Sequence, residues 1–277
     1  MDVILQALLM GIVQGLTEFL PVSSSGHLVL LPYVFGWDDA FIRSLGFSVM
    51  LHVGTLVALL VYFRADWLRI VPAGFATIRD RSFRDDADRR LAWLLVASTV
   101  PAALAGFFLN DVLETQFRSV ELVVVMLVVA GIAMGVADRI GAQTRRVGDV
   151  TFPLAIGIGV AQALALIPGV SRSGISITAG RLAGLDRESA ARFSFLMSTP
   201  ITAGAIAFEA RQLLTGEAGV AIEIGPLIVG MVASLLAGMA AIHFMLRYLR
   251  TRSLDIFVLY RFALAALVVL VLITRPG

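Results

Sequence analysis

Apolar runs separated by short polar breaks make up most of this chain. A helix that crosses a membrane needs roughly 20 apolar residues. Blocks near that length lie at 44–63, 91–110, 120–138, 190–213, 225–246 and 254–273. Inside lipid, every backbone hydrogen bond must be satisfied within the protein, so we predict six transmembrane helices at these blocks.

Shorter apolar blocks come in two pairs, each interrupted by proline, glycine and serine. The pairs are 3–20 with 26–36 and 152–168 with 175–185. Blocks 26–36 and 175–185 are too short to cross a bilayer. We therefore predict two re-entrant helical hairpins, about 3–36 and about 152–185, which enter the membrane and turn back.

The two hairpins are related by an internal repeat. A gap-free shift of 148 residues places Gly11 on Gly159. The same shift aligns Gln14 with Gln162, Leu16 with Leu164, Val22 with Val170, Ser23 with Ser171, Ser25 with Ser173, Gly26 with Gly174, Gly36 with Gly184, Asp38 with Asp186 and Phe47 with Phe195. Each half then holds one hairpin and three spans, and this odd number of spans gives the halves opposite topologies.

These elements predict an all-α polytopic membrane protein with an inverted-topology repeat, six transmembrane helices plus two re-entrant helical hairpins. We expect a single membrane domain over 1–277, with repeat A at about 1–140 and repeat B at about 149–275. In secondary transporters with this architecture, broken helices meet at a central site. The two polar breaks are therefore the first place to look for chemistry.

The composition agrees with a membrane protein and excludes other classes. Of the 277 residues, 58% are hydrophobic and 15% are charged, whereas soluble domains carry roughly 25% charged residues. The chain has no cysteine, which excludes disulfides and thiolate metal sites. Its basic residues cluster in loops, so we expect no nucleic-acid partner.

Loop arginines predict the orientation in the membrane. Segments 64–90, 139–149 and 247–253 are rich in arginine, and the positive-inside rule places such loops in the cytoplasm. Both termini then lie outside, the first hairpin opens outward and the second opens toward the cytoplasm. We expect the charged run at 79–90 to be a solvated cytoplasmic loop.

The first polar break follows a carboxylate inside an apolar helix. An intramembrane acid such as Glu18 is a functional candidate by default, and Gln14 shares its helix face at i, i+4. If the turn centres near residues 22–23, Glu18 and His27 come side by side. The hydroxyls of this break suit a helix cap or a binding site, and they belong to Ser23, Ser24 and Ser25.

The second break carries a cation and groups suited to an anion. Arg172 offers a planar fork that fits phosphate oxygens. A backbone nest before a helix N-terminus also binds anions, and we assign it to Gly169, Ser171, Ser173 and Gly174. Placed tip to tip, the two hairpins supply parts for phosphoryl transfer. Glu18 and Gln14 could also hold a hard divalent cation, Mg or Ca, through oxygen ligands.

For the other ionisable residues in the apolar blocks, we predict structural roles. His52 could line the site, but we favour packing. We expect interhelical hydrogen bonding for His243 and snorkelling toward the membrane surface for Arg261.

At the two breaks the sequence resembles the undecaprenyl-diphosphate phosphatase family of the bacitracin-resistance type. The first family motif is (E/Q)xxxE followed by a serine-rich turn and histidine, seen here as QGLTE (14–18) and PVSSSGH (21–27). The second is PGxSRSxxT, seen here as PGVSRSGIS (168–176), in which Ser176 replaces threonine but keeps the hydroxyl. The resemblance covers nearly the whole chain.

The resemblance implies hydrolysis of the C55 isoprenyl diphosphate to the monophosphate and phosphate, which recycles the lipid carrier of cell-wall synthesis. It implies a site open to the outer, periplasmic face of the bacterial inner membrane and an assisting divalent cation. The family's essential groups fall on Glu18, His27, Ser24 and Arg172. Further phosphate contacts are expected from Ser23, Ser25, Gly169, Ser171, Ser173, Gly174 and Ser176.

Three alternatives remain open at this point. The nucleophile is Ser24, His27 or a water molecule activated beside Glu18. The partners are a polyprenyl diphosphate lipid and the bilayer, and a homodimer is left open. The rival function is a transporter that flips a polyprenyl phosphate through the same anion site, since inverted repeats with broken helices are typical of transporters.

Overall fold

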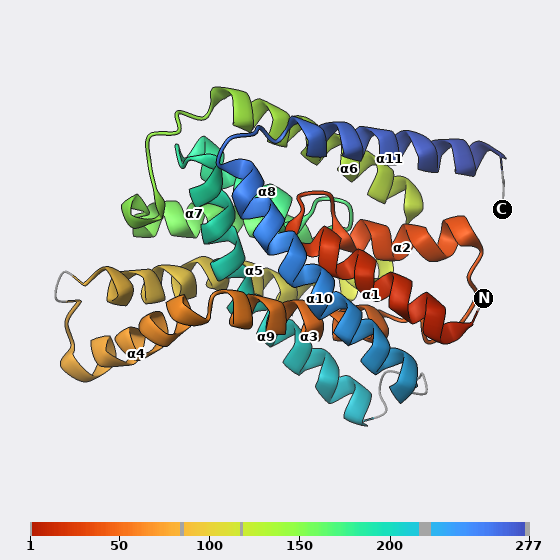
Figure 1. Ribbon diagram of the computed structural model, residues 1–277, viewed down its shortest axis with the longest axis horizontal. Coiled ribbons are helices and arrows are strands. Elements are labelled where there is room, and N and C mark those ends of the chain that lie inside the picture. Colours follow the sequence, from red (N-terminus) through yellow and green to blue (C-terminus); the bar gives the residue numbers. More distant parts are fainter. Residues whose placement is uncertain (1, 84–85, 117–118, 216–222, 275–277) are drawn as a thin grey trace.

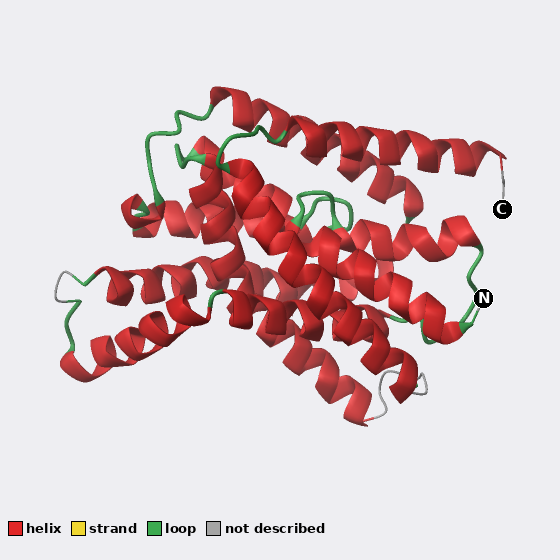
Figure 2. Cartoon of the chain, viewed as in Figure 1, coloured by secondary structure: helices red, strands yellow, loops and turns green. Residues whose placement is uncertain are grey.

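The computed structural model describes residues 2–83, 86–116, 119–215 and 223–274, and these are helical or in loops (Figures 1 and 2). The α-helices are α1 (Val3–Phe19), α2 (Ser24–Phe35), α3 (Leu45–Tyr62), α4 (Arg64–Asp80), α5 (Ala87–Gln116), α6 (Val120–Ile140), α7 (Phe152–Ala163), α8 (Arg172–Leu182), α9 (Arg187–Thr215), α10 (Ile224–Leu249) and α11 (Asp255–Thr274). Two short 3-10 helices, Val147–Asp149 and Leu164–Leu166, join them. The predicted all-α class is confirmed.

Five helices in the described residues are long and apolar enough to cross a membrane. They are α3, α5 over Ala87–Leu109, α6, α10 and α11. The sixth predicted span, 190–213, falls on α9, which is not among the five. Hydroxyl residues along α9, at 194, 198, 199 and 202, make it more polar than the other long helices. The count of six spans therefore stays a prediction.

Two pairs of short helices occupy the predicted hairpins, α1 with α2 and α7 with α8. Their turns share a backbone conformation that L-residues rarely adopt, with φ of 75° at Ser23 and 77° at Ser171. Each serine caps the helix after it, accepting from Gly26 N at 3.2 Å and from Gly174 N at 3.1 Å. The two turns lie beside each other near the middle of the molecule (Figure 2), where Ser173 Oγ donates to Leu20 O at 3.2 Å.

Glycines bring the first helix of each pair very close to a long helix of the other half. A Cβ atom on Gly11 of α1 would lie 2.2 Å from Gly230 O of α10, and one on Gly159 of α7 would lie 2.1 Å from Ser98 O of α5. Only glycine permits such backbone contact, a packing mode that is common between helices in membranes. The hairpins are thereby anchored against long helices.

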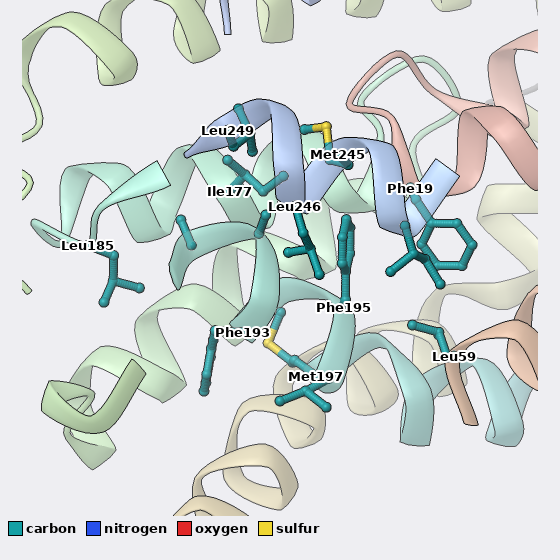
Figure 3. Close-up of a cluster of buried hydrophobic side chains, with 14 of the residues drawn as sticks. Phe19, Leu59, Ile177, Leu185, Phe193, Phe195, Met197, Met245, Leu246 and Leu249 are labelled. Carbon is teal, nitrogen blue, oxygen red and sulfur yellow. The ribbon is translucent and has the colours of Figure 1, made fainter. Parts of the chain in front are cut away.

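A buried apolar cluster lies beside the turns and includes residues of α1, α3, α8, α9 and α10 (Figure 3). The rings of Phe19 and Phe195 meet edge to face at 5.4 Å, a favoured aromatic geometry. Phe19 is the last residue of α1 and directly follows Glu18. Its packing therefore holds the end of α1, and with it the carboxylate, in place.

The charged run at 79–90 is more ordered than the expected solvated loop. Arg79 and Asp80 end α4, and Ala87 begins α5. Arg89 is buried and donates to Asp80 Oδ2 at 2.8 Å and to Ser82 O at 2.9 Å. The expected solvation holds for the exposed residues of the run, among them Arg79, Arg81 and Arg90, and it fails for Arg89, which joins two helices instead of facing solvent. Residues 84–85 of the run lie outside the described residues.

Candidate active site

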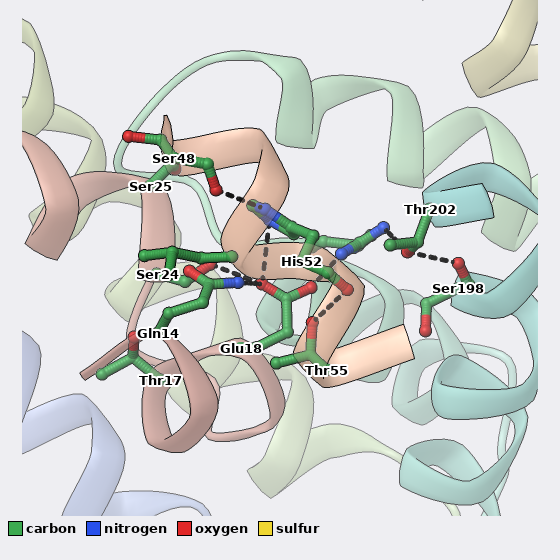
Figure 4. A network of polar contacts seen from close by, with 12 residues as sticks. Gln14, Thr17, Glu18, Ser24, Ser25, Ser48, His52, Thr55, Ser198 and Thr202 are labelled. Atoms are coloured by element: carbon green, nitrogen blue, oxygen red, sulfur yellow. Dashed lines mark hydrogen bonds and ion pairs between the residues drawn. The ribbon is translucent and has the colours of Figure 1, made fainter. Parts of the chain in front are cut away.

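Glu18 is the centre of a polar network between the two turns (Figure 4). It lies in the last turn of α1 and is 7% exposed. Its Oε2 accepts from Gln14 Nε2 at 3.0 Å and from Ser24 Oγ at 2.7 Å. The predicted pairing of Gln14 with Glu18 on one helix face is confirmed. Ser24, the first residue of α2, places its hydroxyl on the carboxylate.

Arg172 brings the second hairpin to the same carboxylate. It is the first residue of α8, and its guanidinium forms an ion pair with Glu18 Oε1. The same group donates to the hydroxyl of Thr202 on α9, which in turn donates to Ser198 O at 2.7 Å. The predicted meeting of an acid from one tip and a cation from the other is confirmed.

His52 of α3 completes the network. Its Nε2 lies 3.4 Å from Glu18 Oε2, and its Nδ1 lies 2.9 Å from Ser48 O (Figure 4). A carbonyl can only accept, so Nδ1 carries a hydrogen and the ring is held with Nε2 toward the acid. Our preference for a packing role was therefore wrong, because α3 turns this histidine toward the polar network.

His27 does not join the network. Its Nδ1 lies 2.7 Å from Ser23 O and its Nε2 lies 2.8 Å from Tyr260 Oη, and the two rings stack at 5.7 Å. The expectation that Glu18 and His27 lie side by side was wrong. Ser24, at the start of α2, takes the position opposite Glu18, and His27 lies one turn further on, against α11. Its catalytic role stays a prediction.

The network borders a cavity of about 210 Å³. The polar residues that line this cavity are Glu18, Ser24, Ser25, His52, Gln162, Arg172 and Thr202. A carboxylate, a hydroxyl on that carboxylate, an imidazole and a guanidinium around one cavity suit transfer of an anionic group. Larger cavities of about 480 and 410 Å³ lack this set of groups.

The remaining predicted phosphate contacts have partners within the turns. Ser23 and Ser171 cap helices, and Ser173 bonds Leu20 O. Ser176 Oγ donates to Arg172 O at 2.7 Å. The backbone N–H of Gly174 donates to Ser171 Oγ, and the carbonyl of Gly169 accepts from Arg261 at 2.7 Å. Of the further phosphate contacts predicted from the sequence, only Ser25 is among the described residues that line the cavity.

Arg261, in the middle of α11, ties the two turns together. Its side chain is completely buried. It donates to five backbone carbonyls, which are those of Pro21 (3.2 Å), Met126 (3.2 Å), Leu127 (2.9 Å), Gly169 (2.7 Å) and Val170 (3.2 Å). The expected snorkelling was wrong, because these carbonyls satisfy the guanidinium at depth. The signal available in the sequence was a lone arginine inside an apolar span.

His243 has the interhelical role that we expected. Tyr62 Oη of α3 and His243 Nδ1 of α10 lie 3.3 Å apart. This contact does not line the cavity.

A metal site is not evident from the protein ligands alone. The described residues hold no group of three or more His, Cys, Asp or Glu side chains that could bind a metal ion. Among the described residues, Glu18 is the one carboxylate that lines the cavity, and Gln14 beside it contributes an amide. Such a set fits a Mg²⁺ ion that also takes substrate phosphates and water, and does not fit an all-protein cage.

The fold and the cavity define a helical membrane protein with an acid–arginine site between two turns. The model of the family described as bacitracin resistance protein BacA matches residues 7–267, and the chain belongs to this family. An undecaprenyl-diphosphatase of Rubrobacter xylanophilus is 49% identical over 271 residues, 98% of each chain. One of Desulforudis audaxviator is 45% identical over 270 residues, again 98% of each chain. One of Nocardioides sp. is 45% identical over 262 residues, 95% of this chain and 94% of the relative.

Proposed function

We propose that the protein is an undecaprenyl-diphosphate phosphatase. It hydrolyses undecaprenyl diphosphate to undecaprenyl phosphate and inorganic phosphate and so recycles the lipid carrier for cell-wall synthesis. The relatives that bear this name align with it over nearly their full length. The observation that carries the proposal is the convergence of Glu18, Ser24 and Arg172, from two separate turns, on one cavity.

Ser24 is the proposed nucleophile. Its Oγ already donates to Glu18 Oε2 at 2.7 Å, the arrangement of a hydroxyl with its general base. The oxygen attacks the terminal phosphorus as Glu18 takes the proton. The bond between that phosphorus and the bridging oxygen breaks, and undecaprenyl phosphate leaves. Glu18 gives its proton to the departing phosphate. Water then attacks the phosphoserine, one of its protons goes to Ser24 Oγ, and inorganic phosphate leaves.

Arg172 and His52 have supporting roles in this mechanism. Arg172 stabilises the charge that develops on the phosphoryl oxygens, since its guanidinium faces the cavity and is oriented by Thr202. His52 Nε2 lies 3.4 Å from Glu18 Oε2, and it donates to this carboxylate and orients it when the ring carries a proton on both nitrogens. Attack by water activated at Glu18 is the second candidate. Attack by His27 has less support, because both of its ring nitrogens contact groups outside the cavity.

The finer topology is part of the proposal. Six spans and two re-entrant hairpins form repeats of opposite topology, and the cavity opens to the outer face of the inner membrane with both termini outside. The equal φ angles of Ser23 and Ser171 support the repeat, as do the close contacts of the aligned pair Gly11 and Gly159 with long helices of the opposite half. The arginine-rich loops support the orientation.

A divalent cation, Mg or Ca, would be held by Glu18 and Gln14 together with the substrate. Bound there, it would neutralise charge on the diphosphate. The side-chain oxygen of Gln14 is buried and has no hydrogen-bond partner among the described residues, which supports the assignment.

Phosphate release in detergent tests the function. An enzyme liberates inorganic phosphate from undecaprenyl diphosphate where no membrane gradient exists, and a flippase leaves the diphosphate intact. We expect the purified protein to release one phosphate per lipid. Intact diphosphate, together with lipid movement in vesicles, would favour the transporter instead.

A further inference from the structure

Gln162 of α7 is a buried amide that lacks a partner. Its side chain is 2% exposed, and neither its Nε2 nor its Oε1 has a hydrogen-bond partner within the described parts of the chain. Leaving such groups unpaired costs roughly 1–3 kcal/mol each, so folded proteins rarely do so without a reason. Gln162 also lines the cavity that contains Glu18 and Arg172.

The internal repeat explains why this amide is unpaired. Gln14, aligned with Gln162, donates to Glu18 one turn later at 3.0 Å. The residue one turn after Gln162 is Leu166, which offers no acceptor and lines the same cavity. The second hairpin therefore retains the glutamine without its carboxylate, and the buried amide has no partner in a residue that lines the cavity.

We propose that Gln162 is a substrate-binding residue that donates its side-chain N–H to a non-bridging oxygen of the diphosphate. This inference rests on the proposed function. A phosphate oxygen is the acceptor that the amide lacks, and Arg172 draws the same anion into the cavity. The amide adds a donor without adding charge, and its Nε2 has no bond to Glu18.

Substitution of Gln162 distinguishes a role in substrate binding from a role in folding. Replacing Gln162 with methionine keeps the length of the side chain but removes both unpaired polar atoms. We expect kcat/KM for undecaprenyl diphosphate to fall by about 10- to 100-fold, the effect of losing a hydrogen bond to a charged group. The Tm of the ligand-free protein stays the same or rises, because a buried unpaired amide has been removed. A structural glutamine would lower Tm.

Ser194→Ala is the matched control. The Ser194 hydroxyl is also buried and has no partner among the described residues, but it does not line the cavity. We expect its substitution to leave kcat/KM within about twofold of wild type while Tm stays the same or rises. Both variants are measured as full-length protein in detergent.

Binding without turnover gives a second readout. Inorganic pyrophosphate, used as a headgroup probe, should raise the Tm of the wild type and raise that of Gln162→Met much less. An unchanged kcat/KM in Gln162→Met, or failure of this variant to fold, would overturn the assignment of Gln162. If the wild type itself releases no phosphate while pyrophosphate still stabilises it through Gln162, the proposed function fails and the binding role survives.

Discussion

At the scale of single residues, the carboxylate of Glu18 decides what its neighbours do. It accepts from Gln14 and Ser24, pairs with Arg172 and lies 3.4 Å from His52 Nε2. A buried acid with four polar neighbours is held in a single orientation. The chemistry of each neighbour can therefore be tested by removing it while the acid remains.

The first prediction concerns the nucleophile. Ser24→Ala should lower kcat for phosphate release at least about 10³-fold, because no hydroxyl then lies on the general base. KM should change little, since the charge contacts of the diphosphate remain. His27→Asn should keep kcat within about tenfold of wild type, because the His27 ring does not line the cavity. The opposite ranking of the two variants would assign the attack to His27.

The second prediction concerns His52. His52→Phe removes the ring nitrogen beside Glu18 and should lower kcat/KM by about 10²-fold, within the usual range for a group that acts with a general base. His243→Phe is the control. His243 Nδ1 lies 3.3 Å from Tyr62 Oη, and neither residue lines the cavity. It should remain within about twofold of wild type. If steady-state assays show the same change in kcat/KM for both variants, His52 has only a packing role.

At the scale of helices, the site depends on holding two turns together. Each turn is short and ends with a serine at positive φ, a conformation that costs of order 1–3 kcal/mol. Arg261 of α11 donates to carbonyls of both turns, which are those of Pro21, Gly169 and Val170. One side chain therefore fixes the distance between the groups that meet in the cavity.

The third prediction follows from this contact. Arg261→Met leaves buried carbonyls of both turns unpaired and should lower the free energy of unfolding, by about 1–3 kcal/mol for each group left unpaired. It should also lower kcat, since Glu18 and Arg172 come from separate turns. Arg261→Lys should recover part of both losses, because an ammonium still donates to several carbonyls.

Arg139→Met is the control for Arg261. Its ion pair with Asp255, at 3.2 Å, is exposed on both sides, and exposed pairs contribute at most about 1 kcal/mol. Denaturation in detergent and steady-state kinetics measure both variants. A stable and fully active Arg261→Met would show that the turns hold their positions without it.

The elements themselves were largely predictable, and their mutual orientation was not. Apolar length and the proline–serine breaks placed both helix pairs, because these signals are local in the sequence. α4 was missed, since its arginines indicated a solvated loop and only packing against α5 explains its order. The choice of His52 over His27 depends on how α3 is rotated against α1. No local pattern encodes that rotation. Of the predicted site residues, Glu18, Ser24, Ser25 and Arg172 line one cavity, and their catalytic and binding roles stay predictions.

At the scale of the whole molecule, the two halves share a backbone plan and differ in side chains. Ser24 has Arg172 as its counterpart, His27 has Ile175, and Glu18 has Leu166. Such a pair of turns gives one site with a reactive side and a binding side. In the proposed mechanism this asymmetry lets a helical arrangement that is typical of transporters carry hydrolysis, since the proposed nucleophile Ser24 and its base Glu18 both belong to the first half.

The last prediction tests the orientation of this arrangement in the membrane. The chain has no cysteine, so a single introduced cysteine is the only thiol. Asp38→Cys, in the exposed segment between α2 and α3, should react with a membrane-impermeant maleimide in intact cells whose outer membrane has been made permeable. Thr251→Cys, exposed between α10 and α11 beside Arg250 and Arg252, should react only after the inner membrane is opened, because the positive-inside rule places that loop in the cytoplasm. The reverse pattern would place the cavity on the cytoplasmic side, and labelling of both from outside would show that these segments share one face and that the halves do not have opposite topologies.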